Sequence, residues 1–348
     1  MLISAVFTRR AALVAGLLAA LSAPALAADK VSVGALRFVS SGPLFLAVER
    51  GYFAEQQIEP EIKFFEAAQP IAVAVVSGDV DYGLTAFTAG FFNLAGKGAV
   101  KIIAAQAKEA KGFEGNAILA SNAAFEKGLK SPKDIAGKSL GITQVGSSFH
   151  YQVGQIARIE GFDLKSVDLR PLQSLPNMIA ALKGGQVDAV LLAPHLAKPL
   201  VAAGEAKLLG WYADLDEYQF GGLFTATKTA TGKREVTQRF VKAYQKGLAD
   251  YAAAFLRRKG DGSPIHDEAT TKAATQIAKY VYASDPPDVG AKKTIASAFY
   301  VDAQGRLDVA DIVKQVEWMK AQGLVEASVD PRSAMDLSFV EGHFNAPK

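Results

Sequence analysis

Short apolar runs alternate with helix-like segments along the first part of the chain, and Gly, Pro, Asp or Ser separates them. The apolar runs predict buried strands at 31–36, 60–65, 80–84, 100–105, 117–120, 139–143, 166–172, 188–192 and 206–212. The segments between them predict helices at 43–49, 70–76, 89–96, 148–160, 176–183 and 197–203, with a capped turn at 131–135. Strands that alternate with short helices predict an α/β fold with doubly wound, mainly parallel sheets.

The pattern changes after Trp211. Residues 214–222 are polar and glycine-rich, and 223–227 reads as one more strand, which returns to the first part of the fold. The sequence beyond it predicts only helices, including 270–282 and 309–322. An apolar stripe with helical spacing comes first and predicts a helix that is buried on one face: Val236, Phe240, Tyr244, Leu248, Tyr251 and Phe255.

Two parts of the chain repeat each other with an offset of 107 residues. Asp188 follows Asp81 by this offset, and Gly141 follows Gly34 by the same offset. A shared offset predicts two lobes of similar build with a cleft between them. Both aspartates should lie at strand starts, so we interpret them as turn residues and not as ligand contacts, because open α/β sheets bind ligands at the carboxyl ends of strands.

The order of elements places the second lobe inside the first. Lobe one is predicted to comprise 28–114 and 219–348, and lobe two 115–218. The chain then crosses between the lobes twice, near 112–116 and 214–222, and two crossings can form a hinge of few residues. Acidic residues near these crossings suggest a solvated hinge and leave a ligand amine open as an alternative: Glu109, Glu114, Asp214, Asp216 and Glu217.

The first residues resemble an export signal. Arg9 and Arg10 precede an apolar run at 11–21, and Ala25-Leu26-Ala27 has the small-residue pattern of a cleavage site. We therefore predict a signal peptide over 1–27, cleavage after Ala27 and a periplasmic protein. The double arginine leaves both twin-arginine and ordinary Sec export open, and the apolar run is too short to span a membrane as a helix.

Composition narrows the possible chemistry. The chain has no cysteine, so it can carry neither a disulfide nor a lipid-modified cysteine. Without the two arginines of the predicted signal, 36 basic residues face 35 acidic ones, a net charge of +1. This balance, without a basic patch interleaved with aromatics, gives no indication of a nucleic-acid partner. None of the four histidines has a partner at metal-ligand spacing, so no metal and no cofactor are expected.

Five short stretches carry a family resemblance: Pro43–Phe53 with its Gly-Tyr-Phe ending, Ser77–Asp81, Asp134–Lys138, Val145–Ser148 and Gln315–Leu324. In this order and spacing they resemble the periplasmic solute-binding proteins of ATP-driven (ABC) importers, of the nitrate/sulfonate/taurine type also called NMT1/THI5-like. The resemblance implies a type II two-lobed fold with extra C-terminal helices on lobe one. It also implies a receptor, which we expect to be monomeric, that hands a small-molecule solute to a membrane permease and its ATPase. No nucleophile–base pair stands out in the sequence, so we expect no enzymatic activity.

Residues that follow the predicted strands are the candidate solute contacts, because strand carboxyl ends should face the cleft. In lobe one they are Arg37, Phe38, Ser40, Ser41, Gln69, Thr85, Phe87 and Gln106. In lobe two they are Gln144, Gly146, Ser147, Ser148, Phe149, Asn177, His195 and Trp211. The mixture of small polar and aromatic side chains suits a pocket with a few oriented hydrogen bonds and apolar walls, and favours an organic ligand.

Gly146-Ser147-Ser148 is the sharpest of these signals, since it links a strand to a helix. Hydroxyls and free N–H groups at a helix start favour an anion, although an ordinary serine cap has the same sequence. Arg37 could bind a carboxylate or sulfonate or be an exposed charge, and each aromatic candidate could instead be core. We predict a small organic anion, sulfonate or carboxylate, aromatic or not. The alternatives are a thiamine or pyrimidine precursor, nitrate, bicarbonate, or a role in ligand sensing.

Overall fold

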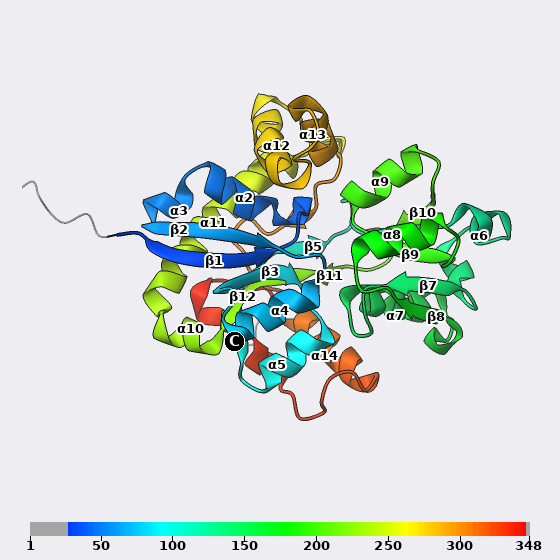
Figure 1. The fold of residues 1–348 in the computed structure, drawn as a ribbon, viewed down its shortest axis with the longest axis horizontal. Coiled ribbons are helices and arrows are strands. Elements are labelled where there is room, and N and C mark those ends of the chain that lie inside the picture. The colour runs from blue at the N-terminus through cyan, green and yellow to red at the C-terminus, as the bar shows by residue number, and fades with distance from the viewer. Residues whose placement is uncertain (1–26, 346–348) are drawn as a thin grey trace, which may run out of the picture.

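The computed structural model describes residues 27–345 and shows two α/β lobes (Figure 1). The predicted signal peptide lies outside the described residues, except for Ala27. Among residues 27–345, no helix has both the length and the apolarity needed to cross a membrane.

Each lobe contains a five-stranded sheet, and the two sheets have corresponding strand orders. Lobe one has the order β2-β1-β3-β12-β4, and lobe two has β8-β7-β9-β6-β10. The strands of lobe one are β1 (Asp29–Ala35), β2 (Ile58–Phe64), β3 (Tyr82–Ala86), β4 (Val100–Ala105) and β12 (Gly221–Ala226). Those of lobe two are β6 (Ala117–Ala120), β7 (Ser139–Ile142), β8 (Asp168–Pro171), β9 (Ala189–Leu192) and β10 (Lys207–Trp211). The α/β class with mainly parallel sheets is thus confirmed.

One strand in each sheet runs against the others, which the sequence pattern does not predict. β12 is antiparallel to β3 and β4, and β6 is antiparallel to β9 and β10. Both are the first sheet strands after the chain has passed from the other lobe. They therefore start at the interlobe edge, where the parallel strands end, and must run in the opposite direction.

Helices cover both faces of each sheet. In lobe one they are α2 (Gly42–Glu49), α3 (Tyr52–Glu55), α4 (Ala68–Ser77) and α5 (Ala89–Gly96), and in lobe two α6 (Asn122–Glu126), α7 (Ser148–Glu160), α8 (Leu175–Lys183) and α9 (Pro194–Ala202). The C-terminal helices α10 (Thr227–Gly232), α11 (Arg234–Phe255), α12 (Glu268–Val281), α13 (Pro287–Ile295) and α14 (Val309–Ala321) surround lobe one (Figure 1).

The aromatic stripe of α11 is core, as its spacing indicates. Phe240 is fully buried and stacks on Tyr82 of β3, with ring centroids 4.1 Å apart. The prediction of only helices in this part is wrong at one point, because β13 (Tyr300–Val301) pairs with an earlier strand. A strand of two residues has no alternation that could identify it in the sequence.

The two interlobe crossings lie side by side. β5 (Ala107–Glu109) and β11 (Tyr218–Gln219) form an antiparallel ladder, and β13 adds to its other edge. Figure 1 shows β5 and β11 between the lobes. This ladder lies just before the first predicted crossing (112–116) and within the second (214–222), while the lobe boundaries at 114/115 and 218/219 stay a prediction.

The repeated aspartates make the same hydrogen bonds in both lobes. Asp81 Oδ2 accepts from Ser32 N (2.9 Å) and Ser32 Oγ (3.2 Å). Asp188 Oδ2 accepts from Ser139 N and Ser139 Oγ, both at 2.8 Å. Each serine Oγ in turn accepts from the backbone N–H of its aspartate. We call these contacts the Ser–Asp locks. They hold neighbouring parallel strands together at the edge far from the carboxyl ends.

Removing one lock carboxylate should destabilise its lobe without changing the cleft. For Asp188→Ala we expect a loss of about 1–3 kcal/mol in unfolding free energy, because the N–H and hydroxyl of Ser139 lose their partner. Urea unfolding followed by circular dichroism measures the loss. Asp79→Ala is the matched control, since the Asp79 carboxylate pairs only with the exposed Ser77 hydroxyl. Equal losses for both variants would show that the lock does not stabilise the sheet.

Candidate functional site

A cavity lies between the lobes at the carboxyl ends of the strands, and we call it the inner chamber. Lobe one contributes Phe38, Gln69, Thr88 and Phe220, and lobe two contributes Gln144, Ser147, Ser148, Phe149 and Leu175. Its free volume is about 20 Å³, close to what one water molecule needs. The lobes are therefore closed on each other around this cavity, and a solute group larger than a water molecule can enter the inner chamber only if they part there.

Gly146 lies at a close backbone contact between the lobes. Its carbonyl accepts a hydrogen bond of 2.8 Å from Ala89 N, at the start of α5 in the other lobe. Its φ is +80°, and a Cβ at this position would lie 2.7 Å from the Cβ of Ala89. The glycine is thus needed both for its left-handed backbone and for the close approach of the opposite lobe.

The start of α7 faces the inner chamber. Ser147 caps the helix, since its Oγ accepts from His150 N at 3.3 Å, and Gly146 N donates to His150 Nδ1 at 3.1 Å. The cap interpretation of Ser147 is therefore confirmed, and Ser147 and Ser148 also line the chamber. The first N–H groups of a helix have no partner within the helix, and the helix dipole makes this end attractive to anions.

Lobe one presents an amide on the opposite wall. The Thr88 hydroxyl donates to Gln69 Oε1, and Thr88 Oγ1 accepts from Phe91 N at 3.0 Å, which caps α5. Because Oε1 is engaged in this hydrogen bond, Nε2 is the part of the Gln69 amide that can donate to a solute. The candidate set from the sequence lacks Thr88. A threonine directly before a predicted helix is nevertheless a recognisable N-cap signal.

Three polar candidates of lobe one are buried and do not line the chamber. Ser40 Oγ, Thr85 Oγ1 and Gln106 Oε1 have no hydrogen-bond partner within the described part of the chain. Gln106 Nε2 lies 3.5 Å from both the Ser40 carbonyl and Ser41 Oγ, and Ser41 is also fully buried. Their proposed contact with a solute thus depends on a change in conformation.

Other candidates lie farther from the chamber. Phe87 is core, with its ring centroid 5.5 Å from that of Phe91 and 5.7 Å from that of Phe92. Asn177 is exposed and donates to the Leu172 carbonyl at 2.8 Å. Trp211 ends β10, where it pairs with Ala117 at the interlobe end of the sheet, and lines neither interlobe cavity.

Arg37 and His195 line a second interlobe cavity, which we call the outer chamber. Its volume is about 290 Å³, and its walls include Phe38, Phe65, Leu175, Ile179 and Tyr282. Phe38 and Leu175 belong to both chambers. The Arg37 guanidinium lies 3.8 Å above the ring of Phe64 and donates to the Tyr280 carbonyl at 3.1 Å.

A larger hollow of about 380 Å³ lies elsewhere on lobe one, between Lys30, Glu59 and Asp81. It belongs to one lobe only and opens at the starts of the strands. Ligands of open α/β sheets bind at the carboxyl ends, so we assign the site to the interlobe chambers.

The hinge contains a buried carboxyl group, in contrast to the solvated hinge expected from the sequence. Glu109 is fully buried and accepts from Asn116 N (3.1 and 3.2 Å) and from Gln152 Nε2 (3.1 Å). Burial raises the pKa of Glu109 to about 7. Gln152 belongs to α7, so this carboxyl group joins the first crossing to the helix that faces the inner chamber.

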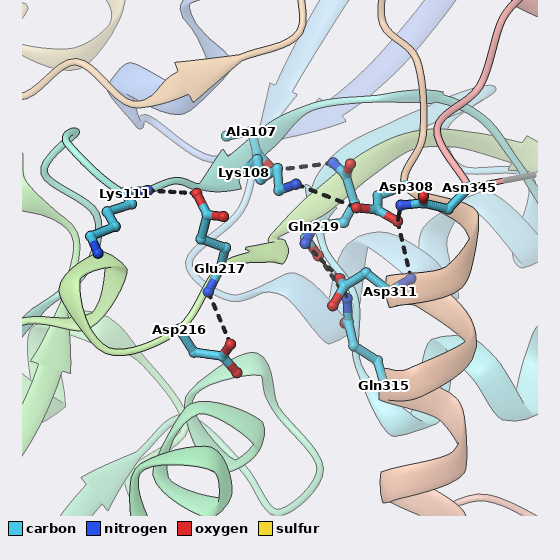
Figure 2. Close-up of polar contacts among 10 residues, drawn as sticks. All are labelled: Ala107, Lys108, Lys111, Asp216, Glu217, Gln219, Asp308, Asp311, Gln315 and Asn345. Carbon is cyan, nitrogen blue, oxygen red and sulfur yellow. Dashed lines mark hydrogen bonds and ion pairs between the residues drawn. The ribbon is translucent and has the colours of Figure 1, made fainter. Parts of the chain in front are cut away.

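The second crossing is held by α14. Gln219 N donates to Asp311 Oδ2 at 2.7 Å, and Gln315 Nε2 donates to the Gln219 carbonyl at 2.9 Å (Figure 2). Burial raises the pKa of Asp311 to about 6. Glu217 accepts from Lys111 N at 2.7 Å and so ties the two crossings together (Figure 2).

The acidic residues at the crossings give no support for a ligand amine. Glu114 pairs with Lys198, and Asp216 lies 3.5 Å from Arg158 and 3.3 Å from Lys314. None of Glu109, Glu114, Asp214, Asp216 and Glu217 lines either chamber.

Comparisons with known proteins agree with this architecture. The family model described as "NMT1/THI5 like" matches residues 39–254. The alkanesulfonate-binding protein SsuA from Xanthomonas axonopodis pv. citri, bound to MOPS, is 19% identical, with 90% of this chain and 100% of that chain covered and a TM-score of 0.68.

Two further solved structures share the fold. The periplasmic aliphatic sulphonate binding protein SsuA from Escherichia coli is 17% identical over 92% of this chain and 97% of that chain, with a TM-score of 0.66. The periplasmic nitrate-binding protein NrtA from Synechocystis PCC 6803 is 12% identical over 87% of this chain and 84% of that chain, with a TM-score of 0.68. No curated protein sequence matches the chain.

A methyl group at Gly146 should open the lobes. In Gly146→Ala we expect faster amide hydrogen exchange at Ala89, because the new Cβ displaces the carbonyl that accepts from this N–H. Gly161→Ala is the matched control, since Gly161 has φ +77° and nothing within 4 Å of its added Cβ. It should share the backbone strain of about 1 kcal/mol but keep the protection of Ala89. Equal exchange in both variants would contradict the closing role of Gly146.

Glu109 should make stability fall as pH rises. Its pKa is about 7 in the fold against 4.5 as the reference value, so between these values the native state holds a proton that the unfolded state has lost. The favourable contribution is complete below pH 4.5 and is lost as pH rises through 7. We expect Glu109→Gln to remove roughly 2–3 kcal/mol of the decline in unfolding free energy between pH 5 and pH 8. Urea unfolding of both proteins at the two pH values tests this; parallel profiles would contradict it.

Proposed function

Because the chain belongs to the NMT1/THI5-like family, we propose that it is a solute-binding receptor of an ABC importer that carries a small organic anion, a sulfonate or a carboxylate. The observation that carries this proposal is the inner chamber, which both lobes build from strand carboxyl ends and from the start of α7. The hydroxyls of Ser147 and Ser148, the Gln69 amide and the first turn of α7 line it, and such groups can donate to the oxygens of an anion.

The two-lobed fold supplies the mechanism of capture. A solute that touches Gln69 in lobe one and Ser147 and Ser148 in lobe two stabilises a form in which the lobes close around it over the open form. The β5–β11 ladder is the hinge about which the lobes move. A micromolar affinity corresponds to about −8 kcal/mol, which a few charge-assisted hydrogen bonds and one buried apolar group can provide.

The solutes named for the neighbours favour an anion. Two neighbours are described as sulfonate-binding proteins and one as nitrate-binding. The aromatic rings of Phe38 and Phe149 in the chamber wall favour an organic anion over nitrate or bicarbonate. A thiamine or pyrimidine precursor is the alternative with apolar surface, and it differs by lacking an obligatory negative charge.

The cellular setting follows from the same proposal. Residues 1–27 direct export to the periplasm, where the monomeric receptor meets the permease and its ATPase. We assign no catalytic activity. The pyrimidine-precursor synthases among the THI5-like proteins carry a cysteine-rich iron motif, and this chain has no cysteine. Solute uptake by cells with and without the gene separates transport from sensing alone.

A thermal-shift screen tests the class of solute. We expect organic sulfonates and carboxylates to raise the melting temperature, since binding to the native state stabilises it by mass action, and nitrate, bicarbonate and pyrimidines to raise it less. Stabilisation by uncharged solutes only would contradict the anion proposal.

Serine substitutions test the site within this screen. Ser148→Ala removes a hydroxyl that lines the chamber, and with Ser147→Ala it should weaken the best anion by roughly 1–3 kcal/mol. Ser174→Ala is the matched control, because Ser174 caps α8 through Asn177 N (3.3 Å) as Ser147 caps α7. It should lower stability by about 1 kcal/mol and leave the affinity unchanged. An equal loss of affinity in all variants would show that helix capping, and not contact with the solute, is responsible.

A further inference from the structure

The outer chamber continues the inner chamber and is also walled by both lobes. Phe38 of lobe one and Leu175 of lobe two line both cavities. These two side chains therefore separate the inner chamber from the outer chamber. The outer chamber has about 290 Å³, against about 20 Å³ for the inner one. Most of the space for a solute between the closed lobes is therefore in the outer chamber.

His195 gives the outer chamber an unused pair of hydrogen-bonding atoms. Its side chain is 4% exposed, and neither Nδ1 nor Nε2 has a partner among the described residues. The ring packs edge-on against Phe38 with centroids 4.5 Å apart. The His195 carbonyl accepts from the Tyr282 hydroxyl of lobe one at 3.5 Å. The imidazole thus lies at the lobe interface with its polar atoms unsatisfied, which is unfavourable unless a ligand pairs them.

The imidazole is neutral, because burial lowers its pKa to about 3. A neutral imidazole offers one donor and one acceptor, and the chamber around it is mainly apolar through Phe65, Ile179 and Val281. The charged residues of this chamber are Arg37, whose guanidinium is engaged by Phe64 and the Tyr280 carbonyl, and the exposed Glu66. Such surroundings suit an apolar group that carries one uncharged polar function.

We infer that the cleft binds an elongated solute with three parts: an anionic head in the inner chamber, an apolar body that passes Phe38 and Leu175, and an uncharged hydroxyl, carbonyl or amide group that hydrogen-bonds to His195. The position of the head rests on the proposed function, whereas the body and the polar group rest on the outer chamber. Inorganic anions and the shortest sulfonates fill only the inner chamber and bind less tightly.

Three probes separate these parts. Methanesulfonate presents the head alone, and benzyl alcohol presents the body and the polar group alone. Hydroxymethyl-phenylalkanesulfonates with zero to three methylene groups before the sulfonate present all three. We expect the best joined probe to bind at least about 100-fold more tightly than either fragment, because joining makes the second contact intramolecular. Isothermal titration calorimetry measures the affinities.

Variants of the outer chamber test the role of His195. His195→Leu should weaken the joined probe about tenfold, the equivalent of one buried hydrogen bond, and leave methanesulfonate unchanged. His195→Gln keeps a donor and an acceptor and should restore most of the loss. His266→Leu is the matched control, since it makes the same exchange at an exposed histidine that lines neither chamber, and it should leave the affinity for the joined probe unchanged. The His195 imidazole proton signal, identified among the four histidines by its absence in His195→Leu, should shift when benzyl alcohol is added.

The outcomes distinguish this inference from the proposed function. If methanesulfonate binds but benzyl alcohol does not shift the His195 signal and the joined probes gain nothing, the elongated solute is wrong and the anion receptor stands. If benzyl alcohol shifts the signal but no sulfonate binds, the outer chamber stands while the anionic head and the proposed function both fail. If no probe binds, both proposals fail. Tight binding of the joined probe that His195→Leu does not weaken also overturns the assignment of His195.

Discussion

The hydrogen bonds between a strand serine and the aspartate before the neighbouring strand set the geometry on which the rest of this protein depends. In lobe one they join Ser32 to Asp81, and in lobe two Ser139 to Asp188. They accompany the same strand register, with Val33 beside Tyr82 and Leu140 beside Ala189. Because the locks hold one end of the parallel strands, the loops at the other end of both sheets are free to face each other and form the cleft.

Buried polar contacts hold the hinge. Glu109 binds Asn116 and Gln152, and the C-terminal helix α14 holds Gln219 through Asp311 and Gln315. Trp318 of α14 also packs edge-on against Tyr151 of α7, with centroids 5.3 Å apart. The helix that presents its first turn to the solute is thus held by the hinge and by the end of the chain. We expect the movement of the lobes to change the Glu109–Gln152 and Trp318–Tyr151 contacts together, because both involve α7.

Backbone groups and side chains contribute to the cleft in different ways. Gly146 brings the lobes into contact at Ala89, and the adjacent start of α7 supplies donors in the inner chamber. Phe38 and Leu175 then separate this polar end from the larger apolar outer chamber. Ser40, Thr85, Gln106 and His195 have polar atoms without a partner among the described residues, and all four lie at or after the ends of inner strands. A solute in the cleft can reach these buried groups with a smaller conformational change than groups elsewhere in the lobes would need.

The sequence by itself determined the elements, the repeat and the edge of the sheets where the site lies. Helix caps, glycine stops and alternating apolar runs are local signals, so α5 and α7 have the predicted bounds, and the 107-residue offset reappears as two equivalent locks. Only the tertiary structure decided which strand-end residues share a cavity. Phe87 and Trp211 follow the same local rule as Phe38 and Phe149, yet the first pair packs elsewhere and the second pair lines the inner chamber. The burial of Glu109 and the pairing of β13 also depend on segments far apart in the chain. No local pattern records such contacts, because burial and pKa follow from what the rest of the fold places around a residue.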